Sequence, residues 1–255
     1  MKDRRSCIKS DFRRIFRSPR FYLALGISLA ILLRPLEQVV RYKVGGTFLE
    51  MLSIPFALSD FTPFAAIFCV LPFADSFCED YRSGYVRAVA LRIGIKRYAW
   101  QRCLTVLLSG ALLMAAVVGI TLLVCAFLTT TPETEESAQF LRRSVWAQMG
   151  VLTERQWMMA ILRVLLGFLF GGLWALAGLT VSVVMPNRYV TLAAPFAIYQ
   201  ILWFLLEGSA FNPVYMLRGD SNFLPSFPFI VIWQLFLNGL CFLASYIGIK
   251  RRLAE

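Results

Sequence analysis

Charged side chains inside apolar segments are the residues of this chain that could do chemistry within a membrane. Arg34, Glu37 and Arg41 recur at i, i+3 and i+7, so a continuous helix places them on one face. Arg34 and Glu37 could pair there, which would lower the cost of charge at mid-depth. Alternatively, the apolar segment ends near residue 34 and these groups lie at the outer interface. Asp75 lies close to the end of another apolar segment, where an interfacial carboxylate is favoured over a proton relay.

Motifs for catalysis and for nucleotide binding are absent from the sequence. The chain has no His, so the usual base for a Ser or Cys nucleophile is missing, and there is no GxSxG. It has no GxxxxGK[ST] and therefore no P-loop for ATP. The six Cys form no CxxC, so we expect neither a zinc or haem site nor disulfides. We therefore expect that this chain is not an enzyme and binds no cofactor or metal itself.

Six apolar segments must position these residues. Each is about as long as the roughly 20 helical residues that cross a hydrocarbon core about 30 Å thick. A hydrophobic content of 58% and a mean hydropathy of +0.66 exceed what a soluble core of this size requires. We therefore expect an all-α polytopic membrane protein, a single transmembrane domain over residues 1–255. Its expected spans are about 21–40, 57–77, 103–128, 158–184, 189–207 and 227–248.

The basic residues fall mostly in every second gap between these segments. The first 20 residues hold eight Lys and Arg, residues 78–102 hold six, and the tail from Lys250 holds three. Short loops rich in Lys and Arg stay cytoplasmic, so we expect both termini in the cytoplasm. The net charge of +11 is spread beside the spans. We therefore expect these residues to contact anionic lipid headgroups and not a nucleic acid.

Residues 6–17 have the pattern of an amphipathic helix that lies in the membrane interface. Ile8, Phe12, Ile15 and Phe16 recur at i, i+4, i+7 and i+8 and form one apolar face. Ser18-Pro19 then ends this helix. It is either a simple basic anchor or an elbow helix that a cytoplasmic partner contacts.

Small residues mark two of the spans as close-packing helices. Ala111, Ala115 and Gly119 are spaced four apart in the third span. Gly167 and Gly171 have the same spacing in the fourth. Such faces suit helix association, either within the chain or across a dimer.

The gap at 79–98 has the pattern of a short helix held between two spans. Glu79 and Asp80 stand just before a helical stretch, where carboxylates suit the helix dipole. Gly84 permits a tight turn, and Val86 begins an apolar face that continues through Val89, Ala90 and Ile93. The segment is either a device for contacting a partner or an ordinary connecting loop.

This segment resembles the cytoplasmic loop of type-2 ABC permeases, the transmembrane subunits of many bacterial ATP-binding-cassette exporters. The residues that carry the resemblance are Asp80-Tyr81-x2-Gly84, Val86-Arg87 and Lys96-Arg97-Tyr98, in that order. An amphipathic helix before the first span and six spans also fit the family. The chain departs from it in Arg34, Pro35 and Glu37 within the first span, and in Asp80 where members usually have Glu.

The resemblance implies a machine of two permease subunits and two ATPase subunits in a bacterial plasma membrane. A cytoplasmic ABC ATPase would bind ATP and Mg, and the second permease would be another copy or a paralogue. Cargo in the family includes peptides, lantibiotics, drugs and lipid-linked glycans, so a hydrophobic or amphipathic cargo is expected. A secondary carrier or channel, or a membrane assembly factor, is the alternative. The coupling loop would contact the ATPase through Glu79, Asp80, Tyr81, Gly84, Val86, Arg87, Arg97 and Tyr98.

Overall fold

The computed structural model describes residues 6–41, 51, 54–56, 58–59, 61–129, 156–218 and 227–254. Within these ranges the secondary structure is entirely helical. The helices are α1 (Ser6–Arg17), α2 (Pro19–Arg41), α4 (Phe61–Val70), α5 (Ser76–Arg82), α6 (Tyr85–Ile93), α7 (Ile95–Leu128), α9 (Gln156–Val184), α10 (Arg188–Leu205), α11 (Tyr215–Arg218) and α12 (Phe227–Ala254).

Five of the described helices are long and apolar enough to cross a membrane, namely parts or all of α2, α7, α9, α10 and α12. Their lengths and composition are those of a multi-pass membrane protein. The spans expected at 21–40, 158–184 and 189–207 agree with α2, α9 and α10 to within two residues at each end. Helix α12 begins at residue 227 as expected but extends six residues farther, to Ala254. The third span is longer than expected, because α7 already begins at Ile95.

The expected second span is not one continuous helix. In its place, α4 has ten residues, a turn covers residues 71–75, and α5 follows as a separate short helix. Pro72 explains the break, because it lacks a backbone N–H and disfavours helical geometry at the residue before it. Ten helical residues rise about 15 Å, roughly half of a hydrocarbon core. Within the described residues, α4 therefore does not count as a crossing helix.

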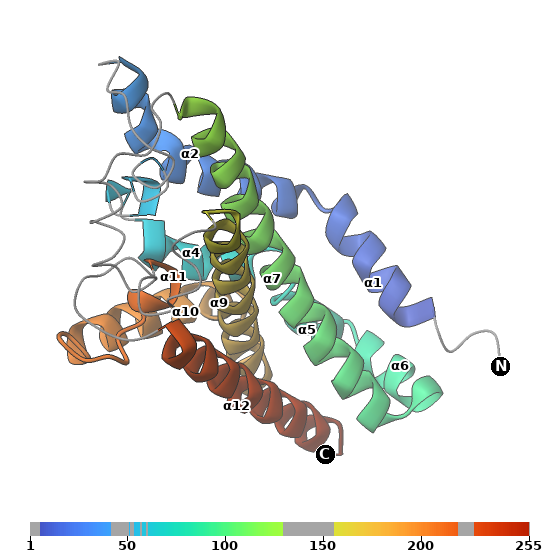
Figure 1. Ribbon diagram of the computed structural model, residues 1–255. Helices are drawn as coiled ribbons and strands as arrows, with labels where there is room; N and C mark the ends of the chain where they lie inside the picture. Colours follow the sequence, from blue (N-terminus) through green and yellow to red (C-terminus); the bar gives the residue numbers. More distant parts are fainter. Residues whose placement is uncertain are drawn as a thin grey trace.

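The centre of the structure is the crossing of α7 and α9, where two glycines bring the backbones together (Figure 1). A Cβ at Gly110 would lie 2.5 Å from the carbonyl oxygen of Gly171 and 2.6 Å from the Cβ of Ala175. The small residues of the fourth span thus serve packing within the chain. In the third span Gly110 makes this contact, whereas a Cβ at Gly119 would meet no atom of another element within 4 Å.

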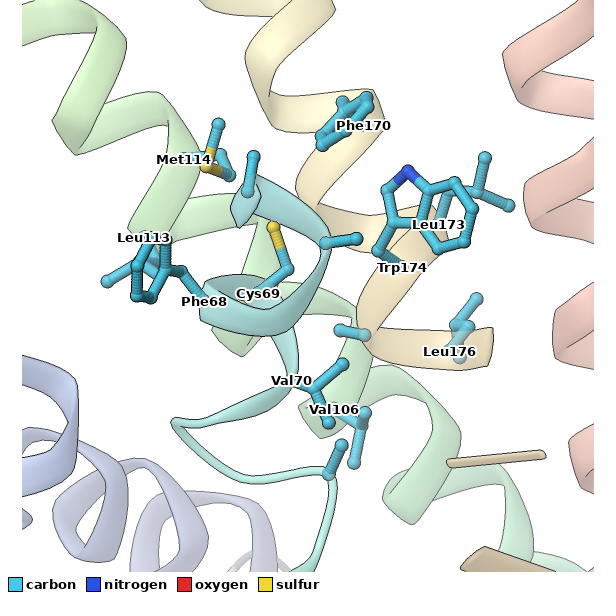
Figure 2. Packing of buried hydrophobic residues seen from close by; sticks show 14 of the residues in the cluster. Phe68, Cys69, Val70, Val106, Leu113, Met114, Phe170, Leu173, Trp174 and Leu176 are labelled. Carbon is cyan, nitrogen blue, oxygen red and sulfur yellow. The ribbon is translucent and has the colours of Figure 1, made fainter. Parts of the chain in front are cut away.

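The short helix α4 is packed against both α7 and α9. Figure 2 shows Cys69 and Val70 of α4 between Met114 of α7 and the side chains of Phe170 and Trp174 on α9. These five side chains are almost entirely buried in one apolar cluster. The turn after α4 lies beside the first part of α7, where the Arg102 guanidinium is 4.7 Å from the centre of the Phe73 ring.

Polar side chains join α12 to the rest of the bundle. The Nδ2 group of Asn238 donates to the Leu169 carbonyl at 3.0 Å, and the hydroxyls of Thr180 and Ser245 lie 2.8 Å apart. Hydrogen bonds of this kind are typical glue between membrane helices. The C-terminal end of α12 reaches the same end of the structure as α1, α5 and α6 (Figure 1).

Candidate functional site

A network of eight charged side chains lies at the end of the structure where α1, α5 and α6 meet. Three of its carboxylates belong to the turn after α4 and to α5, and the fourth belongs to α1. Its arginines come from α1, α2, α7 and α10, so four other helices meet around α5. Four carboxylates face four guanidinium groups, which leaves the network without net charge. Its members are Asp11, Arg14, Arg20, Asp75, Glu79, Asp80, Arg102 and Arg188.

Arg102 and Asp80 form the buried centre of this ion-pair network. Nη2 of Arg102 donates to Oδ2 of Asp80 at 2.5 Å, and the Arg102 side chain is only 3% exposed. The guanidinium also lies 4.7 Å from the centre of the Phe73 ring, within cation–π range. Asp11 of α1 is 3.9 Å from Nη1 of Arg102. Burial raises the pKa of the Asp11 carboxyl, and the Arg102 guanidinium partly offsets this effect.

The remaining pairs connect α5 with α1, α2 and α10. Arg14 donates to Asp80 at 3.1 Å and to Glu79 at 3.2 Å. Arg20 donates to Asp75 at 3.0 Å and also reaches Glu79. Nε of Arg188 approaches Asp75 to 3.0 Å from the start of α10.

Asp75 is therefore a buried, paired carboxylate. It was expected at a position that water can reach, but its residue is 1% exposed. The pairing with Arg20 and Arg188 compensates its burial, since a buried charge needs a close partner.

Helix α6 lies next to this network. A two-residue turn joins it to α5, and a single residue joins it to α7. Gly84 has a φ of +72°, a left-handed conformation that favours glycine, and it begins α6. Gly94, with a φ of +87°, separates α6 from α7. The predicted turn role of Gly84 is thus present in the structure.

The two faces of α6 differ in exposure. Val86 and Ala90 are buried, and Val89 and Ile93 pack against the same core. On the opposite face Leu91 is 88% exposed, and Tyr85, Arg87 and Arg92 are exposed as well. A helix that presents a large apolar side chain among arginines at the end of a membrane bundle has the composition of a contact surface.

A cleft of about 510 Å³ separates α1 from the beginning of α6. Its floor holds members of the ion-pair network, and Tyr85 stands at its α6 side. The cleft continues the exposed face of α6 towards α1. Its lining residues are Ser10, Asp11, Arg14, Asp80, Ser83, Gly84, Tyr85 and Ala88.

The residues predicted for the coupling loop fall into three groups. Glu79 and Asp80 belong to the ion-pair network, and both lie inside α5. Their expected role at the N-terminus of the next helix is wrong, because Gly84 and not an acidic residue precedes α6. Val86 is buried, and Arg87 is exposed on the outer face.

The aromatic residues of this loop serve packing. Tyr81 stacks with Phe77 at a centroid distance of 5.9 Å, and Arg252 of α12 lies 5.7 Å from its ring. Tyr98 is buried near Asp80 and Arg102, whereas Arg97 is exposed.

The N-terminal helix has the bounds predicted for the elbow helix. Ile15 is buried and Phe12 packs against the core, while Phe16 is partly exposed and contacts the ring of Phe21. The side chain of Ile8 lies outside the described residues. One face of α1 thus rests on the bundle, with Arg14 directed to the network.

The pair of Arg34 and Glu37, one of the two alternatives for the first span, is not formed. Helix α2 continues through Pro35, and Arg34 and Glu37 are both exposed on it. No ion pair between them occurs among the residues that the structure describes. They lie more than two helical turns along α2 from Arg20 and take no part in the ion-pair network.

The arginines Arg14, Arg20, Arg102 and Arg188 were read from the sequence only as positive-inside charge. The ion pairs that they form join residues more than 50 positions apart, with one exception, the pair between Asp80 and Arg102. The sequence offered one indication of this network: basic and acidic residues both occur in the gaps that are expected on the cytoplasmic side. Leu91 was also missed, although it is apolar and lies opposite the predicted apolar face of its helix.

Comparisons with models of protein families, with curated proteins and with solved structures find no match to this chain.

Proposed function

We propose that this chain is the permease subunit of an ABC exporter in a bacterial plasma membrane, with both termini in the cytoplasm. The observation that carries the proposal is the mounting of α6. This short helix exposes Leu91, Tyr85 and two arginines, while its other face is buried and the preceding helix is fixed by ion pairs. Such an element suits the transmission of force from a separate soluble subunit.

The proposed path of force runs through the short turns and the ion pairs that join α6 and α5 to neighbouring helices. A push on α6 acts directly on α7, because only Gly94 separates the two helices. It also acts on α5, from which ion pairs lead to Arg14 of α1, Arg20 of α2 and Arg188 of α10. A cytoplasmic ABC ATPase that closes on ATP and Mg would thereby favour one of two helix arrangements.

The cargo proposed for this subunit is hydrophobic or amphipathic, such as a peptide, lantibiotic, drug or lipid-like molecule. The exposed surfaces of α10 and α12 are rich in large apolar side chains, which suits contact with lipid and with a second permease. A second copy of this chain or a paralogue would complete the pathway.

Co-purification tests this function. The tagged chain is extracted from its native membrane in mild detergent, and bound proteins are identified by mass spectrometry. We expect a stoichiometric P-loop ATPase. Leu91→Ser should lower its recovery about tenfold, since exposed apolar anchors of this kind contribute about 1–2 kcal/mol or more to an interface.

Tyr189 provides the matched control. It is 81% exposed at the start of α10, at the same end of the structure but off α6. Tyr189→Ser should leave the recovery of the ATPase unchanged. Recovery of the chain without any ATPase would instead favour a secondary carrier, a channel or an assembly factor.

A further inference from the structure

A groove on the side of α2 is lined by apolar side chains, an arginine and a serine. Its volume is about 450 Å³, and it lies between α2 and the residues that precede α4. We call it the Arg34 groove. It is lined by Ile27, Ala30, Ile31, Arg34, Pro35, Leu58 and Ser59.

The cation in this groove has no protein partner among the described residues. Arg34 is exposed, and neither Glu37 nor another described carboxylate forms an ion pair with it. A charge within a membrane helix is expensive unless it is paired, reaches the interface or faces water. Arg34 is 15 residues from Pro19, hence about 22 Å along α2, which is inside a core about 30 Å thick but close to one boundary. Its long side chain can therefore reach towards lipid headgroups.

A hydroxyl group lines the groove together with Arg34. Oγ of Ser59 accepts from the Phe61 N–H at 3.3 Å, which leaves its own O–H able to donate. Arg34 and Ser59 thus both offer donors to an occupant of the groove.

Apolar side chains line the rest of the groove. Ile27 and Ala30 are exposed on the same face of α2, and Leu58 contributes from the segment before α4. An occupant must therefore carry an anionic head with hydrogen-bond acceptors and a hydrocarbon tail. A soluble anion would leave the apolar side chains uncovered, and a neutral hydrocarbon would leave Arg34 without a partner among the residues that the structure describes.

We propose that the Arg34 groove binds one anionic phospholipid of the surrounding membrane. Arg34 and Ser59 hold its phosphate, and one acyl chain lies along Ile27 and Ala30. Guanidinium groups suit phosphate because they can donate two parallel hydrogen bonds to it. This inference concerns lipid binding by the chain itself and does not depend on the proposed ATPase partner.

The test measures phosphatidylglycerol retained by the purified full-length chain. The protein is mixed with detergent micelles that contain phosphatidylglycerol or phosphatidylcholine, and native mass spectrometry counts the lipids bound. We expect one tightly held phosphatidylglycerol. Arg34→Gln should weaken its binding about tenfold or more, because hydrogen bonds to charged groups are worth about 1.5–3 kcal/mol.

Arg41 is the matched control, since it is exposed on the same helix but does not line the groove. Arg41→Gln should retain the lipid. Ala30→Phe, which fills the apolar part and keeps the charge, should also displace it. Glu37→Gln should strengthen binding, because it removes a nearby negative charge.

Three results would overturn the proposal. If Arg34→Gln retained phosphatidylglycerol like the unmodified chain, the lipid would not bind at this site. If Arg34→Gln and Arg41→Gln lost the lipid equally, basic residues in general would attract it. A co-purified molecule other than phospholipid that Arg34→Gln alone loses would assign the groove to cargo instead. Each variant is shown to be folded if its buried cysteines do not react with a thiol-reactive dye.

Discussion

Replacement of Asp80 by Asn should destabilise this protein far more than replacement of its neighbour Glu79 by Gln. The Asp80 side chain is 8% exposed and contacts Arg102, which is more deeply buried still. Removing the carboxylate charge leaves a buried guanidinium that Asp11, at 3.9 Å, only partly compensates. Breaking a buried pair in this way costs about 3–5 kcal/mol. Glu79 is 37% exposed and pairs with exposed arginines, so water can replace it at a cost of about 0–1 kcal/mol.

The buried cysteines provide the assay. Cys69, Cys103 and Cys125 are free thiols without exposed surface, so a thiol-reactive dye labels them only when the bundle opens. Unfolding of the detergent-solubilised protein is followed by this labelling under increasing denaturant. Asp80→Asn should shift the transition strongly, and Glu79→Gln only slightly.

A double variant separates the loss of pairing from other effects. Asp80→Asn with Arg102→Met removes both buried charges, and we expect it to recover much of the stability lost in the single variant. Equal destabilisation by Asp80→Asn and Glu79→Gln would refute the argument that burial sets the strength of this pair. So would a double variant that is no more stable than Asp80→Asn alone.

Two further substitutions test the packing and the turn. Gly110→Ala should lower the free energy of unfolding by about 1–3 kcal/mol, because its Cβ would lie 2.5 Å from the Gly171 carbonyl oxygen. Gly119→Ala is the control on the same helix, where a Cβ meets open space. It should be neutral or stabilising in the same denaturation assay. Equal effects of the two would contradict the α7–α9 contact. Gly84→Ala should cost about 1–2 kcal/mol, because φ is +72° there, and should reduce ATPase recovery if the orientation of α6 changes; unaltered stability and recovery would show that α6 does not need this turn.

The helical elements were predictable from the sequence where one local pattern dominates. Long apolar runs between polar gaps define α7, α9, α10 and α12, because length and hydropathy alone decide whether a helix can span a bilayer. The buried face of α6 was predictable from the spacing of Val86, Val89, Ala90 and Ile93. The same reasoning placed the N-terminal helix at residues 6–17, where α1 is found.

The features that were not predicted depend on contacts between distant segments. Spacing alone could not decide whether Gly110 or Gly119 meets another helix, because that depends on where α9 crosses α7. The second span was expected to be continuous over 57–77, but α4 ends at Val70, two residues before Pro72, and α4 instead packs against α7 and α9. The pairing of Arg188 with Asp75 joins residues 113 positions apart, which no local pattern specifies.

The most direct test of the account is photo-crosslinking from the exposed face of α6 in the native membrane. A photoreactive amino acid replaces Leu91, and in a parallel sample it replaces Tyr189. We expect position 91 to crosslink a P-loop ATPase and position 189 to give little or none of that product. The crosslink at position 91 should also change in yield when ATP is added, since the two states of the ATPase contact α6 differently. Crosslinks from position 91 only to lipid, or to membrane proteins without an ATPase, would contradict the proposed function.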